Sequence, residues 1–490
     1  MTPEALAAMS PEAKRELLRR LLDERARETT RVAAEKKDDA FQLAHTQRAI
    51  WFLQRLLPET HAYNVTFSGR FSPPLNLNAF RAAMDRLVAR HDALRMVFSE
   101  QDGQPVQRVL SVAEARLGVV DASNLSDAEL YTTVCEESHV PFSLDVPLIA
   151  TTIYRRNDED ILLINVHHLV FDAWSQHILF SDLRALYIAE LNDASIELPD
   201  AEAQYRDFVM EQAVDLDGRH GDELWNYWHS VFDTDPAPLA IRARVEAQNA
   251  LTMQGASVPF SLDSQASAAL NALAKQQNTT LYTIMLAAMQ VLLFQYSGQQ
   301  DVTIGTPVSL RTRSEWLQVI GYFINLLPMR TTIDPTAPFT GHLARARETV
   351  LGALEHQEFP FPLMVSRLKL GRDPNHSPIF QAMLNVIITP KANELASLFT
   401  ASHRTALQFG GSRLTSYVIP QQEGQFEIVI EVTDSDGVLH GNLKYQTDLY
   451  SRETAQRMTD SFLAILEAAV EKPDMSVDDL TRLDRDTFDI

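Results

Sequence analysis

The sequence predicts a mixed α/β protein with two lobes, and three observations lead to this prediction. The 490 residues exceed the size at which one hydrophobic core usually stops growing. Apolar runs rich in β-branched residues alternate with segments of helical periodicity in both halves. A linker-like tract with Pro236 and Pro238 separates the two halves. We therefore expect one lobe over residues 41–210 and a second over residues 211–490.

The first lobe should contain a small number of helices and strands in a clear order. Apolar periodicity and turn residues predict them at these places: a helix around Gln47 to Leu53, a helix over Leu77 to Leu94, a hairpin of Met96 to Phe98 with Val106 to Val109, and a strand Ala150 to Tyr154 that pairs with Ile161 to Val166. Arg90 and Arg95 close the second of these helices, where positive charge suits the helix dipole.

The second lobe begins near Val258 and also mixes both types of element. The pattern predicts a strongly apolar helix Thr280 to Tyr296, a strand Val302 to Gly305, a helix through Val350 and Leu354, strands Phe426 to Val432 and Val438 to Tyr445, and a terminal helix Ser451 to Val470. Neither half has a glycine-rich phosphate loop, which argues against a kinase, an ATPase or a dinucleotide-binding enzyme.

Residues 1–40 differ in composition from the rest. Ser10-Pro11-Glu12 is a good helix start, and the following segment sets leucines between alternating charges. The leucine stripe fits either a solvated linker helix or a helix that docks on the main body or on another protein.

Charge and composition exclude several classes of function. The formal net charge of −22 argues against a nucleic-acid backbone as the main partner. The single cysteine, Cys135, excludes an intramolecular disulfide and a cluster of metal-binding thiolates, which fits a reducing compartment. No segment reads as a signal peptide, and no uncharged apolar run reaches the roughly 20 residues of a membrane span. We expect a cytoplasmic protein that does not enter a membrane.

The stretch Ile161 to Ser175, ILLINVHHLVFDAWS, carries the chemistry. An apolar strand ends in His167 and His168, and Asp172 stands where helical spacing begins. Successive strand residues point to opposite faces, so one histidine should support the site and the other should react. Asp172 lies where a helix N-terminus leaves free N–H groups.

The sequence around these histidines resembles a known family. HHLVFDAWS is similar to the HHxxxDG motif of the condensation domains of non-ribosomal peptide synthetases. Further motifs of that family are matched in order over roughly residues 41–475: LAHTQRAIWFL from Leu43, RHDALRMVF from Arg90, YRDF from Tyr205, IGYFINLLPMR from Ile320, HQEFPFP from His356, RDPNHSPIFQ from Arg372 and YQTDLYS from Tyr445. Ordered motifs over such a span are far harder to obtain by chance than one HHxxxD.

The resemblance implies a fold and an activity. The family has two chloramphenicol-acetyltransferase-like lobes in a V-shaped pseudo-dimer, with the active site on a tunnel where they meet. It transfers an acyl, peptidyl or polyketide chain, held as a phosphopantetheine thioester on a donor carrier protein, to an amine or hydroxyl. The nucleophile is on an acceptor carrier protein or free, and the product is an amide or an ester. No bound cofactor is implied, because substrates arrive on phosphopantetheine arms.

The resemblance also assigns roles to individual residues. His168 matches the family's second histidine and becomes the general base, since an imidazole pKa near 6.5 suits proton transfer at neutral pH. His167 becomes a support. Asp172 is expected to pair with Arg311 of TPVSLR in the second lobe, which would hold the loop that presents His168.

The remaining site residues are assigned to the tunnel or to stabilising the thioester oxygen. The N–H groups near Ala173 and Trp174 at the helix start are the oxyanion candidates. Ser175 either assists them or caps its own helix. Tyr322 and Asn325 lie in a motif that the family places near the tunnel, and packing roles remain open for both.

One position departs from the motif, because Ala173 stands where the family has glycine. A methyl group would be costly if this backbone needed a positive φ or a close approach to the thioester. With a negative φ, alanine should be tolerated, and this is the interpretation we adopt.

Other functions stay open at this point. An epimerisation domain shares HHxxxD and stays an alternative. A cyclisation domain would replace the histidines with aspartates, so we discount it. A condensation-like domain without activity, serving as a docking platform, is a third possibility. A metal site is not expected, because no HExxH-type pair or thiolate set accompanies the histidines. We expect a monomer whose carrier partners act in trans, unless the chain is a piece of a longer synthetase.

Overall fold

The fold is taken from a computed structural model that describes residues 40–111, 114–196, 198–199, 203–241, 254–369, 377–388, 406–420, 424–435 and 437–483. The leucine-rich helix expected before residue 40 lies outside the described residues, as do residues 372–376 of the RDPNHSPIFQ motif. Residue contacts divide the chain into two compact units. Among the described residues, the first unit takes those within 1–213, 311–323 and 392–421, and the second takes those within 214–310, 324–391 and 422–490.

This division differs from a single cut near residue 210. Arg311 to Phe323 was expected in the second lobe, but its contacts group it with the first unit. The physical reason is that the Arg311 guanidinium bonds to Asp172, and Phe323 donates its backbone N–H to the same carboxylate. The chain therefore leaves the second unit after residue 310 and returns to it at residue 324. The segment between them, 311–323, is bonded to the first unit.

The first unit contains a six-stranded sheet in the order β12-β13-β2-β7-β6-β5. Its strands are β12 (Ala406–Phe409), β13 (Ser412–Ser416), β2 (Asn64–Ser72), β7 (Asp160–His167), β6 (Ile149–Arg155) and β5 (Leu117–Asp121). All neighbours are antiparallel except β5 and β6. β7 is buried along its whole length, as expected for the apolar run that leads to the histidines. A separate three-stranded sheet has β4 (Gln104–Val109) between β1 (Phe41–Gln42) and β3 (Met96–Gln101).

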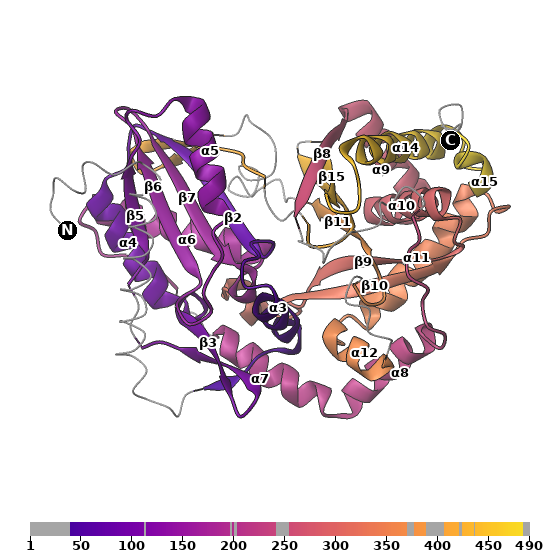
Figure 1. The fold of residues 1–490 in the computed structure, drawn as a ribbon, viewed down its shortest axis with the longest axis horizontal. Helices are drawn as coiled ribbons and strands as arrows, with labels where there is room; N and C mark the ends of the chain where they lie inside the picture. Colours follow the sequence, from indigo (N-terminus) through magenta and orange to yellow (C-terminus); the bar gives the residue numbers. More distant parts are fainter. Residues whose placement is uncertain are drawn as a thin grey trace. The chain divides into compact units, whose positions relative to one another are not determined.

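Helices cover both faces of the six-stranded sheet (Figure 1). The first unit has α3 (His45–Leu56), α4 (Leu77–Arg90), α5 (Asp127–Ser138), α6 (Ala173–Leu191), α7 (Tyr205–Leu216, its last three residues already in the second unit) and the short 3₁₀ turns η2 (Asp92–Arg95), η3 (His168–Val170) and η4 (Ser314–Gln318). On one face, Phe180 of α6 meets Phe67 of β2 edge to face. On the other, Leu130 of α5 packs with Leu163 of β7. α4 ends at Arg90, and the Arg90 side chain bonds to Asp182 of α6.

The second unit contains a second six-stranded sheet in the order β10-β9-β11-β14-β15-β8. Its strands are β10 (Ile324–Thr332), β9 (Asp301–Ser309), β11 (Ala382–Ile388), β14 (Ile428–Ser435), β15 (Val438–Gln446) and β8 (Gly255–Leu262). β11 runs parallel to both of its neighbours, and the other pairs are antiparallel. The helices are α8 (Arg219–Val231), α9 (Ser264–Gln276), α10 (Leu281–Ser297), α11 (Phe339–Glu355), α12 (Phe361–Leu368), α14 (Arg452–Glu471) and α15 (Val477–Leu480).

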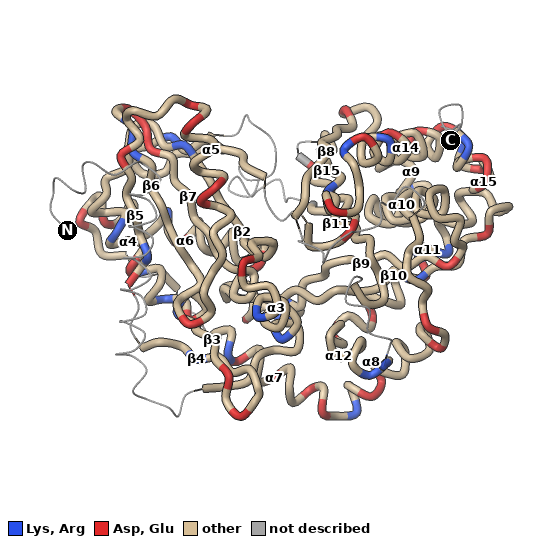
Figure 2. Tube along the Cα trace, in the orientation of Figure 1, with Lys and Arg blue, Asp and Glu red and all other residues tan. Residues whose placement is uncertain are grey.

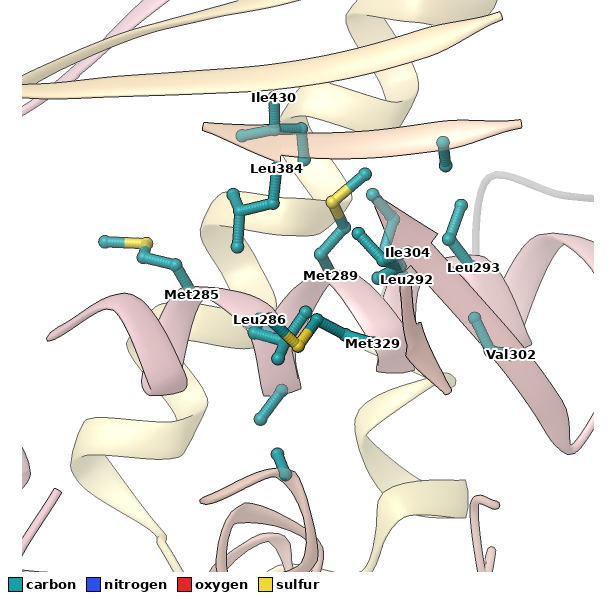
Figure 3. Packing of buried hydrophobic residues seen from close by; sticks show 14 of the residues in the cluster. Met285, Leu286, Met289, Leu292, Leu293, Val302, Ile304, Met329, Leu384 and Ile430 are labelled. Carbon is teal, nitrogen blue, oxygen red and sulfur yellow. The ribbon is translucent and has the colours of Figure 1, made fainter. Parts of the chain in front are cut away.

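α10 is the centre of this unit's core. Its side chains are buried almost all round, and Figure 3 shows Met285 and Met289 of this helix among residues of the sheet such as Leu384 and Ile430. Among the described residues, no single helix has the length and apolarity to cross a membrane, and α9 with α10 meets that test only as a pair bent by 100°. Acidic and basic residues are interspersed along both units, with acidic residues in excess (Figure 2). The predicted mixture of helices and sheets is confirmed.

A close approach at Gly305 of β9 gives a test of this core. A Cβ at Gly305 would lie 2.1 Å from Cε2 of Phe380, a buried ring packed against Phe361 and Phe426. Gly305→Ala should therefore lower the free energy of unfolding by about 1 to 3 kcal/mol through overpacking, measured by urea unfolding. Gly341→Ala in α11 is the control, because its Cβ would meet nothing closer than 3.6 Å. An equal loss in both variants would contradict this packing.

Candidate active site

The end of β7 places the two histidines differently. His167 is the last residue of the strand and pairs with Asn64 of β2. The chain then turns into η3, and the backbone N–H of His168 donates to the Tyr63 carbonyl at 2.8 Å. The two histidines differ in burial, because His167 is buried and His168 is half-buried. Their roles as support and as reactive group stay predictions.

The His167 ring is enclosed and neutral. Its Nδ1 accepts the N–H of Leu169 at 3.1 Å, so Nε2 carries the ring proton and donates to Oε1 of Gln54 at 3.2 Å. Burial, followed by the neighbouring His168 ring, lowers the pKa of His167 to about 3. The ring is therefore a fixed hydrogen-bonding bridge across the turn at neutral pH.

The His168 ring is held in one tautomer by a carbonyl. Its Nδ1 lies 2.7 Å from the Phe171 carbonyl oxygen, which only accepts, so Nδ1 carries the proton and Nε2 keeps its lone pair. Burial lowers the pKa of His168 below 6.5, while the bond to Phe171 and the charge of Asp172 oppose that shift. The Tyr322 ring packs edge to face on the imidazole, with centroids 5.3 Å apart. A neutral ring with the proton on Nδ1 and the lone pair on Nε2 is the protonation state that a general base requires.

Asp172 caps α6 and is fully enclosed. Its side chain accepts the N–H and the hydroxyl of Ser175, each at 2.7 Å, and the N–H of Phe323 at 3.1 Å. The Arg311 guanidinium adds bonds of 3.0 and 3.1 Å to the two carboxylate oxygens. These donors occupy the carboxylate, and it influences His168 through its charge. The predicted pairing of Asp172 with Arg311 is present.

The Arg311 side chain is buried, with 2% of its surface exposed against 0% for Asp172. The guanidinium also donates to the carbonyls of Trp316 and Val319 and lies over the Phe323 ring, 3.9 Å from its centroid. Burial lowers the pKa of Arg311, and the Asp172 charge opposes this shift. One cation therefore fixes the 311–323 segment to the start of α6.

The start of α6 exposes its first two residues. Ala173 is exposed and is not among the described residues with a positive φ, so its methyl group is tolerated where the motif has glycine. The indole N–H of Trp174 donates to the Leu317 carbonyl at 2.9 Å, and its side chain is 43% exposed. Helix geometry leaves the N–H groups of Ala173 and Trp174 without a carbonyl four residues back. They stay available as oxyanion donors.

Two other expected site residues are engaged in packing. The Ser175 hydroxyl is buried and lies within 3.0 Å of Asp172, Arg311 and the Gly321 backbone, so it holds the helix cap. Of the two roles expected for Ser175, this geometry agrees with capping its own helix. Asn325 of β10, in the second unit, donates to the carbonyls of Gln357 and Phe359 at 2.8 Å. Its amide group is committed to that turn, which agrees with the packing role that the sequence left open for it.

Tyr322 contacts the His168 ring and also takes part in packing. Its ring touches His168, and its backbone carbonyl accepts the Tyr205 hydroxyl at 2.8 Å. A Cβ at the preceding residue, Gly321, would come within 2.1 Å of the Tyr205 ring. The segment before β10 is therefore fitted closely against α7.

Sequence reasoning missed the residues that hold the histidine turn from the other side. Gln47 and Gln54 of α3 are buried, and they bond to the Leu169 carbonyl and to the His167 ring. Their spacing of seven residues, with Ile50 between them on the buried face, was the available signal. Within the described ranges, no three His, Cys, Asp or Glu side chains gather as a metal site.

Comparison with known proteins agrees with this fold. Residues 37–487 match the family described as Condensation domain. The chain is 31% identical over 441 residues to a linear gramicidin synthase protein of Brevibacillus parabrevis, covering 89% of this chain and 8% of that protein. It is also 31% identical over 455 residues to the phosphinothricin tripeptide synthetase PhsC of Streptomyces viridochromogenes, covering 92% and 41% of the two chains. Across three linear gramicidin synthase proteins, the chain spans between 6% and 9% of their length.

Solved structures with the same fold include two natural-product proteins. One is holo-AB3403, a four-domain nonribosomal peptide synthetase bound to AMP and glycine, with a TM-score of 0.82 and 23% identity over 90% of this chain and 34% of that one. The other is the X-domain from teicoplanin biosynthesis, with a TM-score of 0.82 and 22% identity over 91% and 98% of the two chains. The X-domain has also been solved in complex with OxyB. The expected chloramphenicol-acetyltransferase-like fold of condensation domains is confirmed.

The buried ion pair makes a prediction about stability. Arg311→Met leaves the Asp172 carboxylate buried without its cation, which should cost about 3 to 5 kcal/mol of unfolding free energy in a urea titration. Arg219→Met is the matched control, since Arg219 is 92% exposed and its pair with Glu223 should contribute little. Similar urea midpoints for Arg311→Met and the parent would contradict the role given to this pair.

The enclosed His167 ring makes a prediction about pH. The unfolded chain takes up a proton on this residue below pH 6.5, while the folded protein does so only near its pKa of about 3. The unfolded state therefore binds more protons in this window, and the free energy of unfolding should fall by about 1.4 kcal/mol per pH unit from pH 6 to pH 4 on account of this residue. Urea midpoints of the parent and of His167→Gln at several pH values measure the slope. An equally steep slope in His167→Gln would refute the assignment.

Proposed function

Because the chain belongs to the condensation-domain family of non-ribosomal peptide synthetases, we propose that it is an acyltransferase acting on carrier-bound thioesters. In this proposal a donor carrier protein delivers an acyl or peptidyl chain on its phosphopantetheine arm. The acceptor is an amine or a hydroxyl, either on a second carrier protein or free. The thioester is already activated, so no covalent enzyme intermediate is needed.

The observation that carries the proposal is the hydrogen bond from His168 Nδ1 to the Phe171 carbonyl. It leaves the lone pair on Nε2 of a half-buried ring, and the lowered pKa keeps that nitrogen unprotonated at neutral pH. As the nucleophile's nitrogen or oxygen bonds to the thioester carbonyl carbon, Nε2 takes its proton. The C–S bond then breaks, the thiolate leaves, and the imidazolium returns the proton to it.

Negative charge that develops on the thioester carbonyl oxygen needs hydrogen-bond donors to stabilise it. The backbone N–H groups of Ala173 and Trp174 at the start of α6 supply them, at the positive end of a 19-residue helix. Asp172 and Arg311 contribute by fixing this helix start relative to His168. Neither side chain takes part in proton transfer, and the Asp172 charge acts on His168 only by opposing the fall of its pKa.

The geometry favours an amine as the nucleophile. The Nδ1 proton of His168 is bound by a neutral carbonyl and not by a carboxylate. No anion therefore stabilises the imidazolium through a hydrogen bond, and with its lowered pKa His168 is a weak base. A neutral amine attacks without prior deprotonation, whereas a hydroxyl needs a stronger base. Amide formation is therefore the reaction that this site supports best.

A docking platform is the second candidate. The fold resembles that of the X-domain, which has been solved in complex with another protein, OxyB. Ala173 in place of the motif glycine keeps a platform open, but its exposed methyl group and negative φ leave the turn intact. We therefore rank the platform below the acyltransferase.

His168→Ala tests the proposal. With acyl- and aminoacyl-pantetheine thioesters and free amine or hydroxyl nucleophiles, the variant should lose about 10² to 10⁴ in the rate of ester formation and less in that of amide formation. Product is measured by mass spectrometry, and His220→Ala serves as the control because this exposed histidine of the second unit bonds to the surface residue Glu358. Equal rates for parent and His168→Ala would contradict His168 as the base, and a parent rate no higher than that without protein would favour the platform.

The parent enzyme should also show a characteristic pH profile. The base works only when unprotonated, so kcat/KM falls on the acid side of its pKa. Because burial lowers the pKa of His168, this fall should be centred below pH 6.5. A fall centred above pH 6.5 would argue against His168 as the base.

A further inference from the structure

We propose that Gln47 and Gln54 of α3 are positioning residues that set the location of the His168 imidazole. The inference rests on the proposed function, since it concerns the base of that reaction. Both glutamines lie on the buried face of α3, two helical turns apart, with Ile50 between them. Their amide groups reach the same three-residue segment, His167 to Leu169.

The two glutamines bond to opposite ends of that segment. Gln47 donates through Nε2 to the Leu169 carbonyl at 2.8 Å. Gln54 accepts through Oε1 from His167 Nε2, and the other nitrogen of that ring accepts the Leu169 N–H. The peptide groups on both sides of Leu169 are thus tied to α3. His168, which lies between these anchors, has its backbone fixed, and the residue is half-buried.

Each glutamine is itself held in place. Gln47 Oε1 accepts the Ala44 N–H at 2.9 Å, and its amide pairs reciprocally with that of Gln107. Gln54 Nε2 donates to the Pro58 carbonyl at 3.2 Å. These bonds fix which end of each amide faces the turn, so the donor of Gln47 and the acceptor of Gln54 are set by their surroundings.

Burial makes this arrangement specific. Gln47, Gln54, His167 and Leu169 are all buried, so each bond forms in a low-dielectric setting and a missing partner leaves a polar atom without water. Apolar residues at 47 and 54 would serve the packing of an amphipathic helix equally well. Glutamines at these two positions add directional hydrogen bonds. Some of these bonds reach the turn that carries His168, and the others orient the amide groups.

The main test replaces each glutamine with methionine, which has similar volume and no amide. Gln54→Met and Gln47→Met should lower kcat for acyl transfer by about 10- to 100-fold with little change in KM, because a base displaced by a fraction of an ångström fails only in the transition state. Gln290→Met is the matched control. Gln290 is a buried helical glutamine of the second unit whose amide donates to Thr331, so its loss should reduce stability without changing kcat.

A double substitution separates positioning from general damage. If the glutamines act through His168, Gln54→Met should reduce the rate no further in a His168→Ala background. A further loss of the same size in that background, or an equal loss of kcat in Gln290→Met, would overturn the inference.

Gln47→Glu supplies a conservative rescue. A buried carboxyl has a raised pKa, and in its protonated form it donates to the Leu169 carbonyl as the amide did. The rate of Gln47→Glu relative to the parent should therefore be higher at pH 6 than at pH 8, whereas the relative rate of Gln47→Met should not change with pH. Parallel behaviour of the two variants would count against the bond to Leu169.

A readout independent of turnover distinguishes this inference from the proposed function. In protein labelled with ¹⁵N-histidine, the ring nitrogen shifts of His168 should change in Gln54→Met and stay unchanged in Gln290→Met. If His168→Ala retains full activity, the proposed function fails, and these shifts alone decide whether the glutamines position the ring. Unchanged His168 shifts in Gln54→Met would overturn the positioning role in either case.

Discussion

The structure of the site depends on one buried carboxylate, that of Asp172. Its two oxygens accept bonds from the first turn of α6, from Arg311 and from the backbone of Phe323. Taking two charges out of water is expensive, and such a pair adds less to stability than its short distances suggest. Its effect is instead geometric. The pair joins segments 139 positions apart and fixes where the helix begins relative to the histidines.

The histidine turn is held on several sides by groups that are not reactive. α3 bonds to the ring of His167 and to the Leu169 carbonyl, the chain before β2 offers the Tyr63 carbonyl to His168, and Tyr322 packs on the His168 ring. Each contact removes a degree of freedom from the turn, while the lone pair on Nε2 of the imidazole points away from the Nδ1 bond that fixes the ring. A rigid support around the ring is what a preorganised base requires.

Much of this could be predicted from the sequence, because the strongest patterns are those of burial. The apolar run before His167 became β7, the helical spacing after Asp172 became α6, and the match of Arg311 to Asp172 is found as a bond. Polar residues were harder. In the sequence, a buried glutamine on an amphipathic helix looks the same as one that faces water, and only tertiary contacts show that Gln47 is buried. The assignment of the 311–323 segment to the first unit likewise depends on contacts, which sequence order does not contain.

The position of Ala173 has a consequence for how such chains are recognised. The residue is exposed, and it is an ordinary first residue of a helix. Glycine at this place is therefore dispensable for the shape of the loop. A search pattern that demands it would pass over proteins whose histidine turn and buried ion pair are intact, whereas a pattern that pairs the aspartate with its distant arginine would retain them.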